Sequence, residues 1–334
     1  MISPAATVPP MTLMTPMTIT SLNDLIRLAA TVDQSPKLAI ARSGDAFVLE
    51  AAMQAYAAGV VEPVFIGDMD ATRRIAEDLG ADISDLRGVH LPDDEAAVRE
   101  AVRMFREGEA ELIMKGAVST STLLKAVLDK TSGVPPQGIL SHVTVFENPH
   151  SGKLMLLSDA AVNIRPNLQR KVEILRNALT VARILGMQVP RAAILAATEK
   201  VNYPAMPATL DADLIARMGR EGAFGDAHVA GPMALDLALS AAAAASKRFH
   251  NEVAGQADIL ITPDIESGNV LYKCLNTLLG LDVAGVVVGS SVPIVVPSRG
   301  DSARSKLLSM ALAVYLIQAV NLDSEHLQSA DITT

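Results

Sequence analysis

The sequence contains no tryptophan, and aromatic residues make up only 3% of its 334 residues. Proteins that bind single-stranded nucleic acid without sequence preference stack the bases on aromatic side chains, and few are available here. The net charge of −9 also argues against a broad surface for nucleic acid or anionic membranes. We therefore expect neither nucleic acid nor a membrane as a partner. An anionic substrate would have to be held by a local cluster of Arg and Lys.

Cysteine is also scarce, because Cys274 is the only one in the chain. A disulfide within the chain is excluded, which suits a reducing cytoplasm, and we expect a cytoplasmic protein. The helical pattern around Cys274 predicts a small buried side chain rather than an acyl carrier. No apolar run has the length of a membrane span. Residues 1–20 lack the basic start and apolar centre of a signal peptide, so we interpret them as a flexible tail.

The rest of the chain alternates short apolar runs with longer helical patterns, which predicts an α/β fold with a mainly parallel sheet. Strands are predicted at residues 37–41, 63–66, 112–114, 192–196, 259–262 and 283–288. Helices are predicted at residues 47–58, 95–107, 172–185, 234–247 and 303–320. The fourth of these predicted helices, residues 234–247, is rich in alanine and would allow close packing at a dimer interface, although helix propensity alone also explains it.

One segment breaks this alternation. A strand at residues 140–146, a turn at 148–152 and a returning strand at 154–157 predict a hairpin, which follows Val134-Pro135-Pro136 and marks a domain crossing. We predict that domain one comprises residues 21–138 and 291–334. Domain two, with the hairpin and the expected dimer contacts, would comprise residues 139–290. The last strand and helix would then return to domain one and place their connection at a cleft between domains.

That connection, Val296-Pro297-Ser298-Arg299-Gly300-Asp301-Ser302-Ala303, is the most informative stretch of the chain. It joins the apolar run 283–295 to a helix, and backbone N–H groups at a helix start favour anions. Arg299 adds a permanent charge with a fork of donors suited to phosphate or carboxylate. Ser298 adds a hydroxyl and Asp301 a candidate base. Asp301 or Ser302 would equally serve as a plain helix cap.

Charged residues also follow other predicted strands, where ligands bind in parallel α/β sheets. These strand ends are Arg42-Ser43-Gly44-Asp45, Lys115-Gly116, Ser158-Asp159, Thr198-Glu199-Lys200 and Asp264-Ile265-Glu266. Any one of them would be unremarkable as a turn or cap, but together they indicate a site at this edge of the sheet.

Residues 262–273, Thr-Pro-Asp-Ile-Glu-Ser-Gly-Asn-Val-Leu-Tyr-Lys, resemble the Pro-Asp-hydrophobic-x-x-Gly-Asn signature of phosphate acetyl- and butyryltransferases. Five further motifs match the same family in the same order, across roughly residues 37–320. They are Met114-Lys115-Gly116, Ser141-His142-Val143, Ser158-Asp159-Ala160-Ala161-Val162-Asn163, Gly231-Pro232-Met233-Ala234-Leu235-Asp236 and Ser298-Arg299-Gly300-Asp301-Ser302. The Lys115-Gly116, Ser141-His142 and Asp301-Ser302-Ala303 details favour the butyryl branch.

The resemblance implies a reversible reaction in which acyl-CoA and phosphate give acyl phosphate and CoA, by direct attack in a ternary complex. It implies a two-domain α/β fold similar to that of isocitrate and isopropylmalate dehydrogenases, with the active site in the cleft. A homodimer is the usual unit of the family, and a higher homo-oligomer is open. No metal or nicotinamide cofactor is implied, and coenzyme A enters as a substrate.

The resemblance also suggests roles for individual residues. Arg299 would hold phosphate and Ser298 would donate a hydrogen bond to the developing oxyanion or the thiolate. The acetyl branch carries its catalytic carboxylate seven residues after the serine, where this chain has Ser305. Asp301 is then the nearest candidate base, with three rivals elsewhere: Asp159, Asp264 and Glu266.

The remaining predicted substrate contacts are Lys115, Lys125, His142, Asn269 and Lys273, beside the three rival carboxylates. Lys125 aligns with a substrate-binding arginine of the acetyl branch, but a solvated helix face explains it too. Asn269 and Lys273 lie one helical turn apart and would face the same cleft. A satisfied buried histidine is an equal alternative for His142.

Two other functions stay open at this point. One is a metal- and nicotinamide-dependent decarboxylating dehydrogenase on the same fold, with Asp211 and Asp213 as metal ligands. The other is a non-catalytic protein that binds CoA or acyl phosphate. The sequence does not separate acetyl from longer acyl groups, since one methylene is worth only about 1 to 3 kcal/mol.

Overall fold

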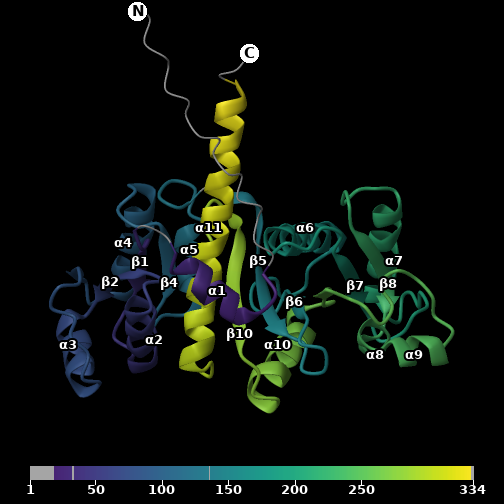
Figure 1. Cartoon of the computed structure of the whole chain (residues 1–334), viewed down its shortest axis with the longest axis horizontal. Coiled ribbons are helices and arrows are strands. Elements are labelled where there is room, and N and C mark those ends of the chain that lie inside the picture. Colours follow the sequence, from purple (N-terminus) through teal and green to yellow (C-terminus); the bar gives the residue numbers. More distant parts are fainter. Residues whose placement is uncertain (1–18, 32–33, 135, 332–334) are drawn as a thin grey trace, which may run out of the picture.

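In the computed structural model, which describes residues 19–31, 34–134 and 136–331, eleven strands form one sheet (Figure 1). The strands lie in the order β3-β2-β1-β4-β11-β10-β5-β6-β9-β7-β8. Their bounds are β1 (Lys37–Ala41), β2 (Glu62–Gly67), β3 (Gly88–His90), β4 (Leu112–Lys115), β5 (Pro136–Glu147), β6 (Leu154–Ser158), β7 (Arg191–Leu195), β8 (His228–Met233), β9 (Ile259–Ile261), β10 (Val283–Ser290) and β11 (Ile294–Val295).

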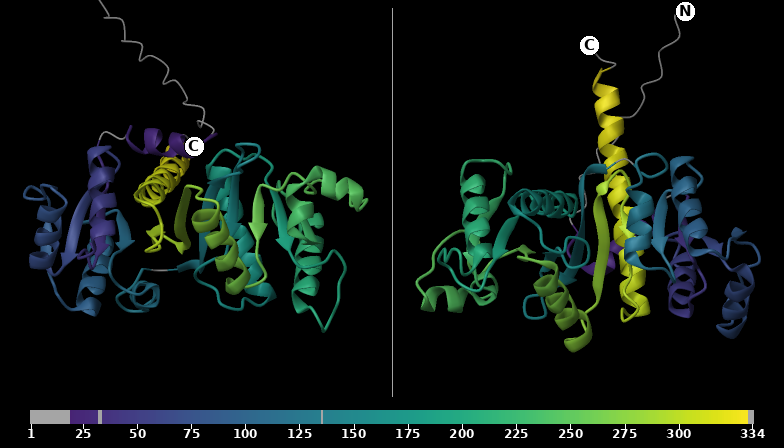
Figure 2. Two further views of the ribbon diagram at one scale, coloured as in Figure 1. Left: turned by 90° about the horizontal axis from the view of Figure 1, so that it is seen from below. Right: turned by 180° about the vertical axis from the view of Figure 1, so that it is seen from behind.

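Helices cover both faces of this sheet (Figure 2). They are α1 (Leu22–Ala29), α2 (Ala46–Ala57), α3 (Met69–Asp78), α4 (Asp94–Arg106), α5 (Thr120–Val127), α6 (Leu168–Ile184), α7 (Pro207–Arg220), α8 (Leu235–Leu239), α9 (Ala241–Ser246), α10 (Ile265–Lys273) and α11 (Ala303–Asp331). A π-helical segment, η1 (Cys274–Leu278), continues α10. Polar residues after strands start several of these helices: Asp45 caps α2, Ser119 caps α5 and Asp264 caps α10.

The sheet consists of two parallel blocks joined by an antiparallel centre. Strands β3, β2, β1, β4 and β11 pair in parallel, as do β6, β9, β7 and β8. Between the blocks, β10 is antiparallel to β11 and β5, and β5 is antiparallel to β6. The predicted α/β fold with a mainly parallel sheet is confirmed. The sheet is continuous across the predicted domain boundaries, and the division into two domains stays a prediction.

The predicted hairpin is the pair β5 and β6, and the six predicted strands and the helices at 47–58, 95–107 and 172–185 are all present. One helix prediction was wrong. Residues 234–247 form two short helices, α8 and α9, because the Ser240 backbone leaves helical geometry and its side chain caps α9 by accepting a hydrogen bond from the Ala243 N–H.

The apolar run 283–295 also differs from a single strand. It forms β10 and β11, which pair antiparallel, because the chain reverses between Ser290 and Ile294. Gly289, with a φ of 100°, lies within β10 where its register with β5 shifts. Cys274 is helical, as predicted, but it is only half-buried, so the prediction of a buried side chain was wrong. Of the predicted tail, residues 1–18 lie outside the described residues. Ile19 is buried, and its N–H donates to the Leu185 carbonyl.

Strand β11 brings the last part of the chain beside the first. Ile294 and Val295 pair in parallel with Ile113 and Met114 of β4, so the connection after β11 emerges next to Lys115. Helix α11 then packs against β10. Its Ser305 and Ser309 hydroxyls accept hydrogen bonds from the buried N–H groups of β10 residues 283 and 285, at 3.1 and 2.9 Å. These serines satisfy backbone donors that the two-residue β11 is too short to pair.

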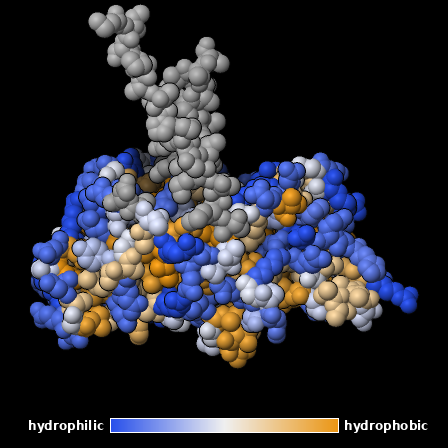
Figure 3. All heavy atoms as spheres, viewed as in Figure 1, coloured by the Kyte–Doolittle hydropathy of each residue, from blue (hydrophilic) through white to orange (hydrophobic). Residues whose placement is uncertain are grey.

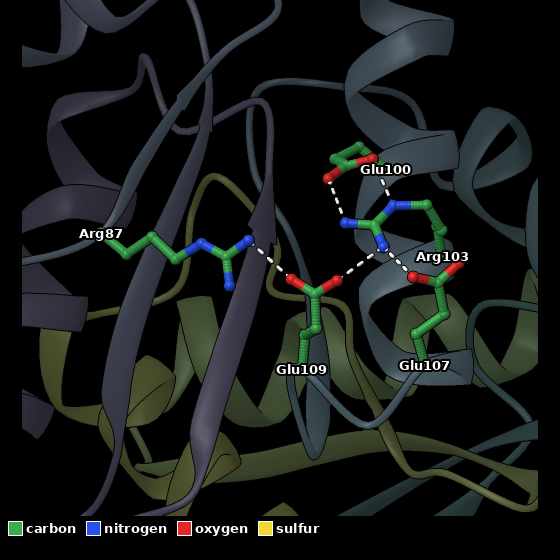
Figure 4. Close-up of polar contacts among 5 residues, drawn as sticks. All are labelled: Arg87, Glu100, Arg103, Glu107 and Glu109. Carbon is green, nitrogen blue, oxygen red and sulfur yellow. Dashed lines mark hydrogen bonds and ion pairs between the residues drawn. The ribbon is translucent and has the colours of Figure 1, made fainter.

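Helix α4 carries a network of ion pairs on its outer side (Figure 4). Arg103 contacts the carboxylates of Glu100, Glu107 and Glu109, and Glu109 also pairs with Arg87 at 2.6 Å. The network ties the end of α4 to the segments that lead into β3 and β4.

The face of the molecule in Figure 3 is mostly polar, with an apolar patch at its lower edge over the end of α10 and η1. Exposed Val270 belongs to α10 and exposed Leu278 to η1, and exposed Leu279 follows η1 directly. Within the described part of the chain, no helix combines the length and the hydropathy needed to cross a membrane.

Candidate active site

The connection between β11 and α11 forms a tight turn held by its own aspartate. One carboxylate oxygen of Asp301 accepts the backbone N–H of Ser298 at 2.7 Å, and the N–H of Asp301 donates to the Ser298 carbonyl at 3.1 Å. Ser302, not Asp301, caps α11, because its hydroxyl accepts the N–H of Ser305 at 3.0 Å. Among the described residues, the backbone N–H groups of Arg299 and Gly300 have no acceptor. The turn therefore presents free donors as well as side chains.

The turn forms one wall of a cavity of about 620 Å³. Helix α10 supplies another wall, and both α10 and the start of α11 lie at the lower edge of the molecule in Figure 1. The cavity is lined by Lys115, Thr120, His142, Ala160, Ala161, Ile265, Glu266, Asn269, Val270, Tyr272, Lys273, Val296, Pro297, Ser298 and Arg299. These residues come from the ends of β4 and β6, the start of α5, strand β5, helix α10 and the turn, so segments distant in sequence meet here.

The cavity is positively charged. The exposed guanidinium of Arg299 has no hydrogen-bond or ion-pair partner among the described residues. Lys115 donates to the carbonyls of Gly116 and Val118 at 3.3 and 3.1 Å, and burial, followed by the nearby Arg299 charge, lowers its pKa. Lys273 donates to the Ser298 hydroxyl oxygen at 2.8 Å. An anion in the cavity would meet these three cations together.

Behind the turn, Lys306 is 2% exposed and its ammonium donates to the Asp301 carbonyl. Burial lowers the pKa of Lys306, and the Asp301 carboxylate opposes this effect. This lysine therefore supports the turn from the side of α11 and does not line the cavity.

The four candidate carboxylates differ in their surroundings. Asp159 is 2% exposed and accepts hydrogen bonds from the N–H groups of residues 161, 162 and 163 and from the Asn163 amide. Asp264 accepts the N–H and hydroxyl of Ser267 at the start of α10. Both shape segments that line the cavity, but neither lines it. Glu266 is the one carboxylate among the described residues that line the cavity, and it has no partner there.

Both oxygens of Asp301 already accept hydrogen bonds. The second oxygen takes the Tyr272 hydroxyl at 2.7 Å, and the Asp301 residue is only 8% exposed. Burial, and next the Asp301 charge, raise the pKa of Tyr272 far above its usual value, so the phenol keeps its proton. Asp301 lies behind the turn and outside the cavity lining.

His142 lies on β5 at the back of the cavity and is 4% exposed. Its Nδ1 is 3.3 Å from the Thr144 hydroxyl, and its ring meets Tyr272 edge to face with centroids 6.0 Å apart. Burial lowers the pKa of His142, while Asp159 and Asp301 oppose the shift. The imidazole is therefore neutral and offers either a donor or an acceptor to the cavity.

Eight of the eleven predicted site residues fall in two groups. Ser298, Arg299, Lys115, His142, Glu266, Asn269 and Lys273 line the cavity, and Asp301 lies directly behind it. Asn269 also donates to the Ala160 carbonyl at 3.2 Å, which joins α10 to the loop after β6. Asp159 and Asp264 lie outside the lining, and Lys125 is exposed on α5 and outside it too.

Three residues of this region were not predicted from the sequence: Tyr272, Thr120 and Lys306. Tyr272 stands beside Lys273 in the 262–273 motif, which was the available signal. Thr120 begins α5, whose N-terminus meets the cavity. No pattern in the sequence singles out Lys306, since a lysine in a helix is normally solvated.

The carboxylates proposed as metal ligands are already engaged. Asp211 pairs with the buried Lys171 at 2.7 Å, and Asp213 pairs with Arg217 at 2.8 Å. They lie on α7, away from the cavity lining. Nothing in this arrangement favours the metal-dependent alternative at these two residues.

Comparison with known proteins gives consistent matches along most of the chain. Residues 94–314 match the family model described as "Phosphate acetyl/butaryl transferase". The phosphate butyryltransferase of Clostridium acetobutylicum is 39% identical over 295 residues, which are 88% of this chain and 97% of that protein. The phosphate acetyltransferase of Thermotoga maritima is 36% identical over 292 residues, 87% of this chain and 98% of that protein.

A solved structure gives the same match in three dimensions. The branched-chain phosphotransacylase of Enterococcus faecalis superposes with a TM-score of 0.74 at 36% identity, over 84% of this chain and 99% of that protein.

Proposed function

The chain belongs to the phosphate acetyl/butyryltransferase family, and on this premise we propose that its cavity transfers a short acyl group reversibly between coenzyme A and inorganic phosphate. The observation that carries the proposal is the turn itself. Arg299, Lys115 and Lys273 line one cavity beside the free N–H groups of the turn that precedes α11, an arrangement suited to a phosphate or acyl phosphate.

We assign Ser298 and Arg299 different roles at the acyl carbon. An ammonium has only donors, so the Ser298 oxygen accepts from Lys273 and its hydroxyl hydrogen remains available to donate. We propose that the Ser298 hydroxyl donates a hydrogen bond to the oxyanion that forms when the thiol attacks the acyl carbonyl. Arg299 neutralises the negative charge of the phosphate attached to the same carbon. This phosphate leaves as the C–O bond breaks.

For the thiol proton we propose Glu266 as the acceptor. It is the carboxylate that lines the cavity, and it shares one face of α10 with Asn269, Val270 and Lys273 at helical spacing. Seven residues along a helix separate Glu266 from Lys273 by about 10 Å, so the two side chains reach different parts of the cavity. Asp301, predicted as the base, does not line the cavity, and its two oxygens are engaged by Tyr272 and the Ser298 N–H.

The direct experiment is phosphate-dependent release of free CoA from acetyl-, propionyl-, butyryl- and isobutyryl-CoA in the presence of EDTA. We expect release that requires phosphate, with a preference for four-carbon chains. The small Ala160 and Ala161 and the apolar Val270 and Ile265 give an acyl chain both room and apolar contacts. Phosphate-independent hydrolysis would contradict transfer to phosphate, and stoichiometric binding without turnover would favour the binding-protein alternative.

Direct transfer has its own signature. If the acyl group passes straight from CoA to phosphate, labelled CoA will not exchange into acyl-CoA when phosphate is absent. Exchange without phosphate would indicate a covalent acyl-enzyme, with Ser298 as its site and Lys273 as the adjacent base.

We also propose the finer features that the fold suggests for the whole protein. The two parallel blocks of the sheet would act as the two predicted domains, with Ser298 and Arg299 on the first and α10 on the second. We propose a homodimer in the cytoplasm, the compartment that a chain with one cysteine suits. Neither a metal nor a nicotinamide has a role in this mechanism.

A further inference from the structure

Tyr272 is a buried residue whose hydroxyl faces away from solvent and toward the Ser298 turn. It is 6% exposed, and its hydroxyl donates to one Asp301 carboxylate oxygen at 2.7 Å. Because burial and the Asp301 charge raise the Tyr272 pKa, the donor keeps its proton over any working pH. A phenol that donates to a carboxylate forms a charge-assisted hydrogen bond, which is stronger than one between neutral groups.

Asp301 connects the Tyr272 hydroxyl to the turn. Its other oxygen holds the Ser298 N–H at 2.7 Å, and Lys306 holds the Asp301 carbonyl. The carboxylate thus has one partner on α10 and one on the turn. If the Tyr272 hydroxyl were absent, the carboxylate would lose the partner that fixes its rotation about the Cβ–Cγ bond.

The residue after Tyr272 reaches the same turn at another point. Lys273 donates to the Ser298 hydroxyl oxygen, and its ammonium lies 4.9 Å from the centre of the Tyr272 ring. Two consecutive residues of α10 therefore hold both ends of the four-residue turn from Ser298 to Asp301. The helix leaves α geometry directly afterwards, at the π-helical segment Cys274–Leu278. Such local widening of a helix is frequent at functional sites.

We propose that Tyr272 is a positioning residue for acyl transfer, acting through Asp301 to fix the backbone and hydroxyl of Ser298 against the cavity. This inference rests on the proposed acyltransferase function and adds a residue to it. Tyr272 does not take up the thiol proton or touch the phosphate; it determines where Ser298 and Arg299 point. Asp301 is accordingly part of the support of the turn and not the proton acceptor.

The test is a double-mutant cycle with Tyr272→Phe and Asp301→Asn. The phenylalanine keeps the ring, and with it the edge-to-face contact with His142 and the Lys273 contact, and removes only the hydroxyl. We expect kcat to fall by about 10- to 100-fold, the range that misplacing a catalytic group by about 1 Å produces, with KM for acyl-CoA and phosphate within about twofold.

The second expectation is strong coupling. If Tyr272 acts through Asp301, adding Tyr272→Phe to Asp301→Asn will not lower kcat further. The matched control is Tyr56→Phe, on exposed Tyr56 of α2, which should leave kcat unchanged. Melting temperatures of all variants separate a loss of positioning from a loss of folding, because the proposal requires kcat to fall in protein that remains folded at the assay temperature.

Three results would overturn the proposal: wild-type kcat in Tyr272→Phe, losses that multiply in the double variant, or a fall in kcat fully matched by a fall in folded fraction. Should Tyr272→Phe not fold, Asp301→Glu takes its place. It keeps the charge but displaces both oxygens, and a wild-type kcat there would overturn the proposal equally. An inactive wild-type protein would instead refute the proposed function.

Discussion

At the scale of single residues, Arg299 is the side chain on which the chemistry depends most. Its guanidinium is unpaired among the described residues and lies at the cavity, next to the free N–H groups of the turn. We expect Arg299→Ala to lower turnover on the order of 10²- to 10³-fold, as loss of one key donor to a developing charge does. Arg299→Lys should recover part of this loss, because the charge returns but the bidentate fork does not.

Steady-state kinetics in both directions measure this effect, with Arg220→Ala as the control. Arg220 is exposed at the end of α7 and lies outside the cavity. Equal rates in Arg299→Ala and the wild type would exclude Arg299 from catalysis. A change confined to the KM of phosphate would assign it to binding alone.

Glu266 leads to a different kinetic expectation. If it takes the thiol proton, Glu266→Gln should lower kcat for acyl-CoA synthesis by about 10²- to 10⁴-fold, the usual contribution of general base catalysis. The remaining rate should rise with pH toward about 8.5, since the reaction then depends on the thiolate that solvent generates. The pH–rate profiles of the variant and the wild type test this.

Chemical rescue makes the test specific. Formate added to Glu266→Ala should restore part of the rate, since a small carboxylate can occupy the space that the side chain leaves. Glu221→Gln, at an exposed glutamate outside the cavity, serves as the control. An unchanged pH profile in Glu266→Gln would remove the assignment, whatever the fate of Asp301→Asn.

Single residues also show how far the sequence predicts the site. The residue types at Ser298, Arg299 and Lys273 could be assigned to a cleft because their chemistry and their motif pointed the same way. The carboxylates could not be separated, because Asp159 and Asp264 differ from Glu266 only in the backbone donors that surround them. Ser305 stands where the acetyl branch has a carboxylate, and only the structure shows its hydroxyl paired to β10.

At the scale of elements, the ion pairs of α4 give a stability prediction. Hydrogen bonds from Arg103, and next from Arg87, lower the pKa of Glu109 from 4.5 to about 2, and Arg103 likewise lowers the pKa of Glu100 (Figure 4). A carboxylate with a lowered folded-state pKa stabilises the protein above its unfolded pKa. That stabilisation is lost as the pH falls through the folded value.

Arg103→Gln should therefore melt below the wild type at pH 7, and the difference should shrink between about pH 4.5 and 2, with Glu109 as the main source. The pairs are partly exposed, so 1 M NaCl should shrink the difference too, since the Debye length is then about 3 Å. Thermal melts across pH and salt provide the measurement. A difference that is independent of both would show that Arg103 acts through packing of its stem.

The elements themselves were predictable where local and tertiary preferences agree. Strands such as β1 and β4 are continuous apolar runs buried on both faces, and they begin and end close to where the sequence indicates. The prediction of one helix over residues 234–247 failed because alanine favours a helix everywhere, whereas the break depends on the cap that Ser240 forms. The two-residue β11 is below the length at which a period of two can be recognised, and its pairing with β4 is a tertiary event.

At the scale of the whole molecule, the cation cluster should couple phosphate to stability. Arg299, Lys115 and Lys273 are like charges at one cavity, and burial, followed by the Arg299 charge, lowers the pKa of Lys115. An anion that binds only the folded state stabilises it by RT ln(1 + [L]/Kd), about 1.4 kcal/mol at ten times Kd. For a chain of this size we expect the melting temperature to rise by about 2 °C.

Phosphate also stabilises proteins in general, because it is excluded from their surfaces, so the rise alone would prove little. The specific part must saturate with phosphate concentration at constant ionic strength, whereas surface exclusion increases steadily. It must also disappear in Arg299→Ala and persist in Arg220→Ala, which retains the cavity. If the melting temperature rose and saturated in both variants, the phosphate site would lie elsewhere on the molecule. The turn between β11 and α11 would then not be the phosphate site.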